Sequence, residues 1–347
     1  MKKLLSFLLV LISAITMCST LTACDYLADG LTYEKLADGT YAVTGVVSYE
    51  TTIKIPSKIK GASVTQIGVD AFRNKTYVEE VELPDTVKKI CDSAFEGAYG
   101  LQKINLENVE VLGRNVFKNS FGKIPKVQLT LNKITSIGAR CFENALGLNK
   151  ITINGNVSVI PRYAFASCSG LATVILGSGV KRLENCAFTG CSSLANLSMP
   201  SVEYIGEECF NSCIVITSLN LPNIQEIKER AFNNCTFITD VTCGENLKQL
   251  FPLAFYGCAA LATFTLTNPV ASDWCYAMVN ANTTMATITD ADSCQGSKYK
   301  HLLNDPAGFA IRLKSGSFNR DSCFLTKTWA EENGLVVGQS YTFTVFK

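Results

Sequence analysis

The chain has 347 residues, of which 47% are hydrophobic and 18% are charged. This composition excludes a disordered chain, which combines low hydrophobicity with high net charge. The formal net charge is only +1, so the overall balance favours neither nucleic acid nor acidic lipid, which clustered cations attract. A single histidine argues against zinc chemistry and against acid–base catalysis by histidine.

The first 24 residues are expected to be an export signal. Two lysines precede an apolar run over residues 4–17, which is shorter than the roughly 20 residues of a membrane span but typical of a signal peptide. The segment ends in Leu21-Thr22-Ala23-Cys24, which resembles a bacterial lipobox. That resemblance implies cleavage before Cys24 and lipid attachment to its thiol. In the alternative, a plain secreted protein, Cys24 would be incidental. No later stretch of the sequence is long and apolar enough to span a membrane.

A short pattern, Ile/Leu-Gly-x-x-Ala-Phe with substitutions, recurs through the middle of the chain. Its phenylalanines follow one another at steps of 22 to 25 residues, as Phe72, Phe95, Phe117, Phe142, Phe165, Phe188, Phe210, Phe232 and Phe255. A fixed period of this length is typical of solenoids. Within each unit the 3.6-residue period of a helix is absent.

Each unit also carries apolar residues spaced L-x-x-L-x-L, for example Leu171, Val174 and Leu176. The last two apolar positions alternate with polar ones, as in a half-buried strand. We therefore expect each unit to contain a short strand and a tight coil or 3₁₀ turn that brings its Ile, Ala and Phe inward. One unit cannot bury its apolar face alone, but stacked units cover one another.

These repeats resemble the BspA-like leucine-rich repeats of bacterial surface proteins. Residues 55–72 match the first turn of that family, and the alternating apolar residues of 29–41 match its N-terminal hairpin. The resemblance covers about residues 28–268 and implies a repeat solenoid of the leucine-rich-repeat type with a β-hairpin cap. Residues 119–131 depart from it, because an extra Phe121 and a 25-residue step indicate a local bulge.

We predict four segments: the lipoprotein signal peptide 1–24, the hairpin cap and first turn 25–66, about nine repeats in 67–268, and a C-terminal region 269–347. The last region is predicted to be a small mixed α/β or β domain. Its predicted strands and helix cover residues 286–289, 309–313, 341–346 and 326–333. A cap over the last turn and a separate ligand-binding module are both open interpretations of it.

The cysteines are expected to be mostly core residues. Five of the 15 lie three positions after a repeat phenylalanine: Cys168, Cys191, Cys213, Cys235 and Cys258. Free cysteine behaves as a small hydrophobe, and the CxxC spacing of metal sites is absent. Stacked equivalent positions carry parallel Cβ vectors, which would strain a disulfide, so we expect reduced, buried thiols.

The C-terminal region contains Cys275, Cys294 and Cys323, and the sequence leaves open whether two of them form a disulfide. They and His301 invite comparison with a thiol enzyme, but a catalytic thiol needs a base in reach and an orienting third group. No local signature supports that arrangement. We therefore expect no enzyme activity, no cofactor and no metal.

We predict a non-catalytic, lipid-anchored cell-surface protein that is exported to the bacterial membrane or outer surface. The resemblance implies adhesion, with a protein or glycan on host matrix or neighbouring cells as the partner. We also expect a monomer, and the neutral charge balance predicts no binding of nucleic acid. The expected binding face consists of outward strand positions: Lys103, Lys126, Lys150, Thr173, Asn196, Ser218, Asp240 and Thr263.

The three lysines of this face would stack as a basic centre that attracts an anionic group. In the alternative interpretation the face is merely solvated, with threonine present as a good strand former. A second alternative makes the repeats a structural spacer that presents a ligand-binding C-terminal domain.

Overall fold

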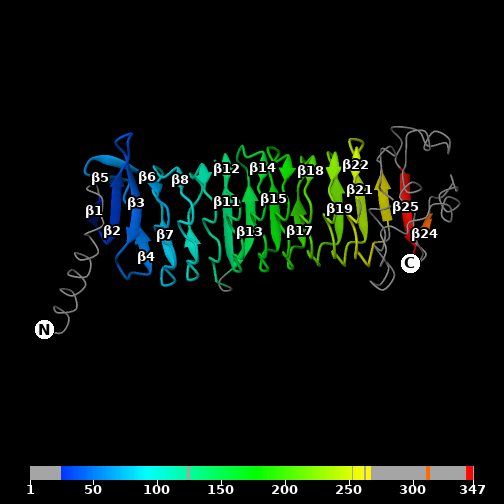
Figure 1. Ribbon diagram of the computed structural model, residues 1–347, viewed down its shortest axis with the longest axis horizontal. Helices are drawn as coiled ribbons and strands as arrows, with labels where there is room; N and C mark the ends of the chain where they lie inside the picture. The colour runs from blue at the N-terminus through cyan, green and yellow to red at the C-terminus, as the bar shows by residue number, and fades with distance from the viewer. Residues whose placement is uncertain are drawn as a thin grey trace.

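The computed structural model describes residues 25–122, 126–251, 253–261, 263–266, 310–312 and 341–346. These residues form an elongated stack of short strands and turns, and α-helix is absent from them (Figure 1). Consequently no helix long and apolar enough to cross a membrane occurs in this part of the chain. The export signal with Cys24, the helix predicted at 326–333, and Cys275, Cys294 and Cys323 lie outside the described residues.

One strand of each turn, the longer one from β11 onward, belongs to a set that we call the first ladder. It comprises β4 (Thr52–Lys54), β7 (Glu80–Glu82), β9 (Lys103–Ile104), β11 (Val127–Leu131), β13 (Leu148–Ile153), β15 (Thr173–Leu176), β17 (Asn196–Ser198), β19 (Ser218–Leu221), β21 (Asp240–Cys243) and β23 (Thr263–Leu266). The strands pair in parallel within three sheets, β4-β7-β9, β11-β13-β15-β17 and β19-β21-β23. The first ladder is therefore interrupted twice.

A second ladder runs along the stack through the Ile/Leu-Gly motif. It comprises β6 (Ala62–Ile67), β8 (Lys89–Ile90), β10 (Val111–Leu112), β12 (Ser136–Ile137), β14 (Val159–Ile160), β16 (Arg182–Leu183), β18 (Tyr204–Ile205), β20 (Glu226–Ile227) and β22 (Gln249–Leu250). Along this ladder two residues of a turn pair with the next turn, and the pairing is interrupted between β12 and β14. In Figure 1 these strands form the upper row of labels and the first ladder the lower row.

The phenylalanine turn follows the second ladder. Its backbone repeatedly forms i→i+3 hydrogen bonds, as from Arg73 N–H to Asp70 O, in a tight coil, which is one of the two predicted forms; a 3₁₀ helix is absent from the described residues. The reason is that the residues two before and two after every repeat phenylalanine, such as Arg140 and Asn144, have positive φ. Between them, backbone amides bond to the next turn, as from Phe142 N–H to Ala164 O at 2.7 Å.

The interior is one continuous apolar core that follows the stack. All nine repeat phenylalanines are fully buried, and consecutive rings stack at centroid distances of 4.6 to 5.3 Å. Such offset stacking adds to the free energy of burying each ring. The L-x-x-L-x-L positions are buried as predicted, apart from the half-buried Leu197. The core therefore confirms the predicted repeat solenoid of the leucine-rich-repeat type.

Antiparallel strands lie at both ends of the stack. At the N-terminus, β2 (Leu31–Lys35) pairs with β3 (Tyr41–Val46) as the predicted hairpin, and β3 pairs in parallel with β6. Two further strands, β1 (Asp25–Ala28) and β5 (Lys58–Ile59), pair antiparallel with β2 and β6. At the other end, β25 (Tyr341–Phe346) pairs antiparallel with β23.

The remaining strand, β24 (Ala310–Arg312), pairs in parallel with β25. Strands were predicted at both places. The pairing of β25 with β23 means that the chain returns from its C-terminal end to the sheet of the last described turn.

Candidate interaction surface

The outer side of the first ladder carries the predicted binding residues, and the structure places them in three separate groups. Lys103 lies in the first sheet beside Glu80 of β7. Lys150, Thr173 and Asn196 are in register on β13, β15 and β17. The backbone positions of Ser218, Asp240 and Thr263 are in register on β19, β21 and β23.

The predicted stack of Lys103, Lys126 and Lys150 is wrong. Lys126 precedes β11, and a register shift between Val127 and Gln128 places Gln128, not Lys126, opposite Lys150. This shift is the irregularity that the 25-residue step indicated. The extra Phe121 enters the core, where its ring stacks on Phe117 at 5.2 Å.

Lys103 is not a free cation either. Its Nζ forms an ion pair with the carboxylate of Glu80 on the neighbouring strand, and this interaction raises the pKa of the lysine. Both side chains are accessible to solvent, so the pair itself contributes little to stability. Its consequence is that a basic centre of three lysines does not form on this face.

From β11 onward the outer face is almost uncharged. The exposed or half-buried side chains that point outward from β11 to β21 are Gln128, Thr130, Lys150, Thr152, Thr173, Ile175, Asn196, Ser198, Ser218, Asn220, Asp240 and Thr242. Ten of these twelve carry no charge, and most are hydroxyl or amide groups that both donate and accept hydrogen bonds. Parallel pairing holds them at the spacing of neighbouring strands, about 4.8 Å. The face suits a partner with many neutral hydrogen-bonding groups.

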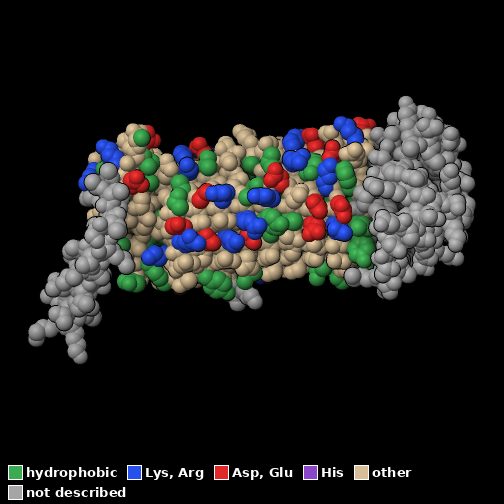
Figure 2. Space-filling model, in the orientation of Figure 1, with side chains coloured by type: hydrophobic (Ala, Val, Ile, Leu, Met, Phe, Trp, Pro, Cys, Tyr) green, Lys and Arg blue, Asp and Glu red, His purple; other side chains and the backbone are tan. Residues whose placement is uncertain are grey.

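The second ladder has a different outer surface, because its charges pair with one another. Lys181 bonds to Glu203 at 3.1 Å in the next turn, and Lys88 approaches Glu110 at 3.7 Å. The guanidinium carbon of Arg182 lies 3.4 Å from the ring centroid of Tyr204. In Figure 2, positively and negatively charged side chains lie next to one another along the described stack. These charged groups pair with one another within the chain, so fewer of them are free to pair with a partner.

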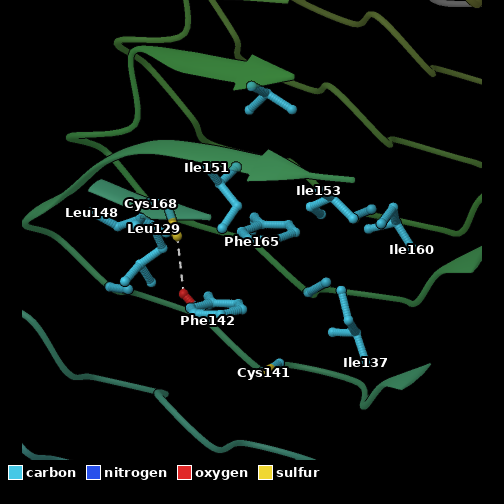
Figure 3. Close-up of a cluster of buried hydrophobic side chains, with 14 of the residues drawn as sticks. Leu129, Ile137, Cys141, Phe142, Leu148, Ile151, Ile153, Ile160, Phe165 and Cys168 are labelled. Atoms are coloured by element: carbon cyan, nitrogen blue, oxygen red, sulfur yellow. Dashed lines mark hydrogen bonds between the residues drawn. The ribbon is translucent and has the colours of Figure 1, made fainter. Parts of the chain in front are cut away.

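Beneath this surface, the thiols three residues after the repeat phenylalanine have a role that the sequence did not reveal. Cys168 Sγ donates to the carbonyl oxygen of Phe142 in the preceding turn at 2.9 Å (Figure 3). Cys191, Cys213, Cys235 and Cys258 repeat this contact at 3.1 to 3.2 Å. Ser120 makes the same bond to Phe95 O.

Each such carbonyl already accepts a backbone amide, as Phe142 O does from Ala145 N–H. A carbonyl oxygen has two lone pairs, and the thiol occupies the second one inside the core. Ala98 and Ala145 fill the same position without a donor. The cysteines therefore act as small apolar residues that also join one turn to the next.

The ten cysteines of the described residues are all free thiols. Burial raises the pKa of Cys168 to about 12 and that of Cys243 to about 12. Desolvation also raises the pKa values of Cys141 and Cys258. These thiols therefore stay protonated at neutral pH. In the same residues, no group of three or more His, Cys, Asp or Glu side chains is placed to hold a metal ion.

Comparison with known proteins identifies the repeats. The sequence profile of the BspA type leucine-rich repeat region, in six copies, matches residues 47–172 and 158–283. A search of curated proteins finds no match.

Several solved structures are similar in fold. A leucine-rich cell surface protein from Faecalibacterium prausnitzii is 19% identical over 70% of this chain and 94% of its own, with a TM-score of 0.33. The leucine-rich repeat protein of T. pallidum is 20% identical over 68% of this chain and 90% of its own, with a TM-score of 0.36. The pneumococcal vaccine antigen PcpA is 19% identical over 71% of each chain, with a TM-score of 0.49.

Proposed function

Because the chain belongs to the BspA type leucine-rich repeat family, we propose that it is an exported, non-catalytic surface protein that binds its partner through the solenoid. The binding face is the outer side of the first ladder from β11 to β23. The partner is a protein or glycan on host matrix or on neighbouring cells, and the protein binds it as a monomer.

Two in-register rows of mostly uncharged hydroxyl and amide groups, one on β11 to β17 and one on β19 and β21, are the observation that carries this proposal. A rigid sheet presents these groups without an ordering cost at the moment of binding, which is the advantage of a preorganised surface. Sugar hydroxyls and peptide groups are the partner groups that match them. An extended solenoid surface also allows many weak contacts to act together.

Anchoring is a further part of the proposal. The Leu21-Thr22-Ala23-Cys24 tetrapeptide supports lipid attachment at Cys24, and buried acyl methylenes would hold the chain on the membrane. The variant Cys24→Ser should leave the membrane fraction and enter the soluble fraction. Retention of this variant in the membrane fraction, judged by fractionation and immunoblotting, would contradict lipid anchoring.

The partner can be sought by incubating the mature protein with extracts of host matrix and of neighbouring cell surfaces. Two truncations then separate the binding solenoid from the alternative of a spacer that presents a ligand-binding C-terminal domain. If the solenoid binds, residues 25–268 retain the captured partner. If the repeats are only a spacer, residues 269–347 retain it.

A further inference from the structure

A second surface lies beside the N-terminal cap, on the loop between β3 and β4 (Figure 1). This loop carries Tyr49, whose side chain is 80% exposed, followed by the exposed Glu50. Isolated exposed apolar residues need no explanation. Here, however, the loop is fixed from both sides and the ring of Tyr77 lies beside the tyrosine.

On the side of the cap, the turn at Asp29 and Gly30 holds the loop. The carbonyl of Gly30 accepts Val47 N–H at 2.8 Å and Ser48 N–H at 3.2 Å. Both Asp29 and Gly30 have positive φ, so the turn has a defined backbone shape. It places the exposed Asp29 carboxylate next to the loop.

On the side of the first repeat, Tyr77 and Glu79 hold the loop. The Tyr77 hydroxyl donates to Ser48 O at 2.7 Å, and Glu79 N–H donates to Thr51 O at 2.7 Å. The ring of Tyr77 is half-buried against the core and lies 5.7 Å from the ring of Tyr49. Tyr49 is therefore supported from beneath by a fixed aromatic ring.

Three carboxylates lie on this loop or on the segments that hold it: Glu50 on the loop itself, Asp29 on the turn of the cap and Glu79 in the first repeat. Among the described residues, Asp29, Glu50 and Glu79 take part in no ion pair, whereas the nearby Lys54 pairs with Glu82 at 3.4 Å. A cavity of about 390 Å³ opens at the same place, lined by Asp29, Glu50, Thr52, Ile53, Lys54 and Pro56. The surface therefore combines exposed aromatic faces, unpaired negative charge and a recess.

We propose that this N-terminal aromatic edge, formed by Tyr49 and Tyr77 with Asp29, Glu50 and Glu79, binds a basic peptide segment. A lysine or arginine side chain satisfies both features, because the aromatic face attracts the cation and the carboxylates pair with it. Its aliphatic stem packs against the tyrosine rings while its charged end remains in water. This site is separate from the uncharged face of the first ladder.

The test measures binding of a short, dye-labelled oligolysine peptide to the full chain by fluorescence anisotropy. Tyr49→Leu should weaken binding about tenfold, which corresponds to about 1.4 kcal/mol, whereas Tyr49→Phe keeps the ring and should bind normally. Glu50→Gln and Glu79→Gln should each weaken binding severalfold. The affinity should also fall as salt is raised.

Glu107→Gln is the matched control, because Glu107 is exposed on a different loop, between β9 and β10, and it should not change binding. Arginine substitutions on the first ladder should not change it either, which separates this site from the proposed function. Unchanged affinity of Tyr49→Leu, or an equal loss in Glu107→Gln, would overturn the proposal. Binding of a neutral oligosaccharide in place of oligolysine would also overturn it.

Discussion

The buried core of the turns keeps the same residue type along the stack, whereas the outer face of the first ladder does not. Inside, the same ring recurs in every turn from Phe72 to Phe255, fully buried and stacked on its neighbours. Outside, the residue at one position changes from Glu80 and Lys103 to Thr173 and Asn196 along the stack. The fold thus depends on the buried column, while the outer face can change its chemistry without changing the fold.

The largest effect is expected in the buried column. Phe188→Ala should cost about 3–5 kcal/mol of unfolding free energy, because it leaves a cavity between two stacked rings. Denaturant unfolding followed by circular dichroism measures this cost. Phe237→Ala is the matched control, because that ring is 57% exposed and its loss should cost only about 0.5 kcal/mol. Equal losses of unfolding free energy in the two variants would contradict the distinction between the buried column and the exposed surface.

A smaller loss is expected in the thiol column. Cys191→Ala should cost about 1–2 kcal/mol, because it removes buried volume and the bond to Phe165 O. Cys191→Ser should cost less, because its hydroxyl can donate to the same carbonyl, as Ser120 does to Phe95 O. Thermal or denaturant unfolding compares the variants, with Ser193→Ala as an exposed control. A serine variant less stable than the alanine variant would show that the bond contributes nothing.

The buried thiols also predict a dependence on alkaline pH. Burial raises the pKa of the Cys168 thiol from 9.0 to about 12, so the folded state favours the protonated form. The resulting stability is complete below pH 9, where the unfolded thiol is also protonated, and is lost as the pH rises towards 12. Unfolding free energies measured across this range should fall, and less steeply in Cys168→Ser. If the unfolding free energy fell equally steeply with pH in the parent chain and in Cys168→Ser, the thiol of Cys168 would not be buried and protonated as described.

Much of the column could be predicted from the sequence, because burial requires the same kind of residue at every period. The nine phenylalanines, the Ile/Leu of the second ladder and the hairpin cap are where the repeat pattern placed them. The pattern also located the irregular turn near Phe121. It could not give the register there, because a longer step does not show whether the extra residues enter the core or bulge outward.

Two other features were harder to predict from the sequence. Arg140 and Glu208, two residues before a repeat phenylalanine, adopt positive φ, although neither residue type favours that conformation, so the sequence did not decide between a tight coil and a 3₁₀ turn. The thiol bonds were hidden because Ala98 and Ala145 occupy the same position as the cysteines, which suggests a requirement for small size alone. Only the position of the phenylalanine carbonyl reveals the donor role.

The smallest effect on stability, and the largest on binding, is expected on the outer face. Thr173→Arg, Asn196→Arg and Ser218→Arg combined should change the unfolding free energy by only about 0.5 kcal/mol per site, because these side chains point into solvent. The arginines would nevertheless replace neutral hydrogen-bonding groups by bulky charges. Ser136→Arg and Ser158→Arg on the side of the second ladder serve as the matched control.

The most direct test of the central claim is the affinity of this triple variant for the partner captured by the mature protein. Surface plasmon resonance with the immobilised partner compares it with the parent chain and with the control variant. The account predicts that the triple variant loses binding at least about tenfold, or about 1.4 kcal/mol, while the control variant binds like the parent. Equal affinity of all three proteins would show that the first ladder is not the binding face.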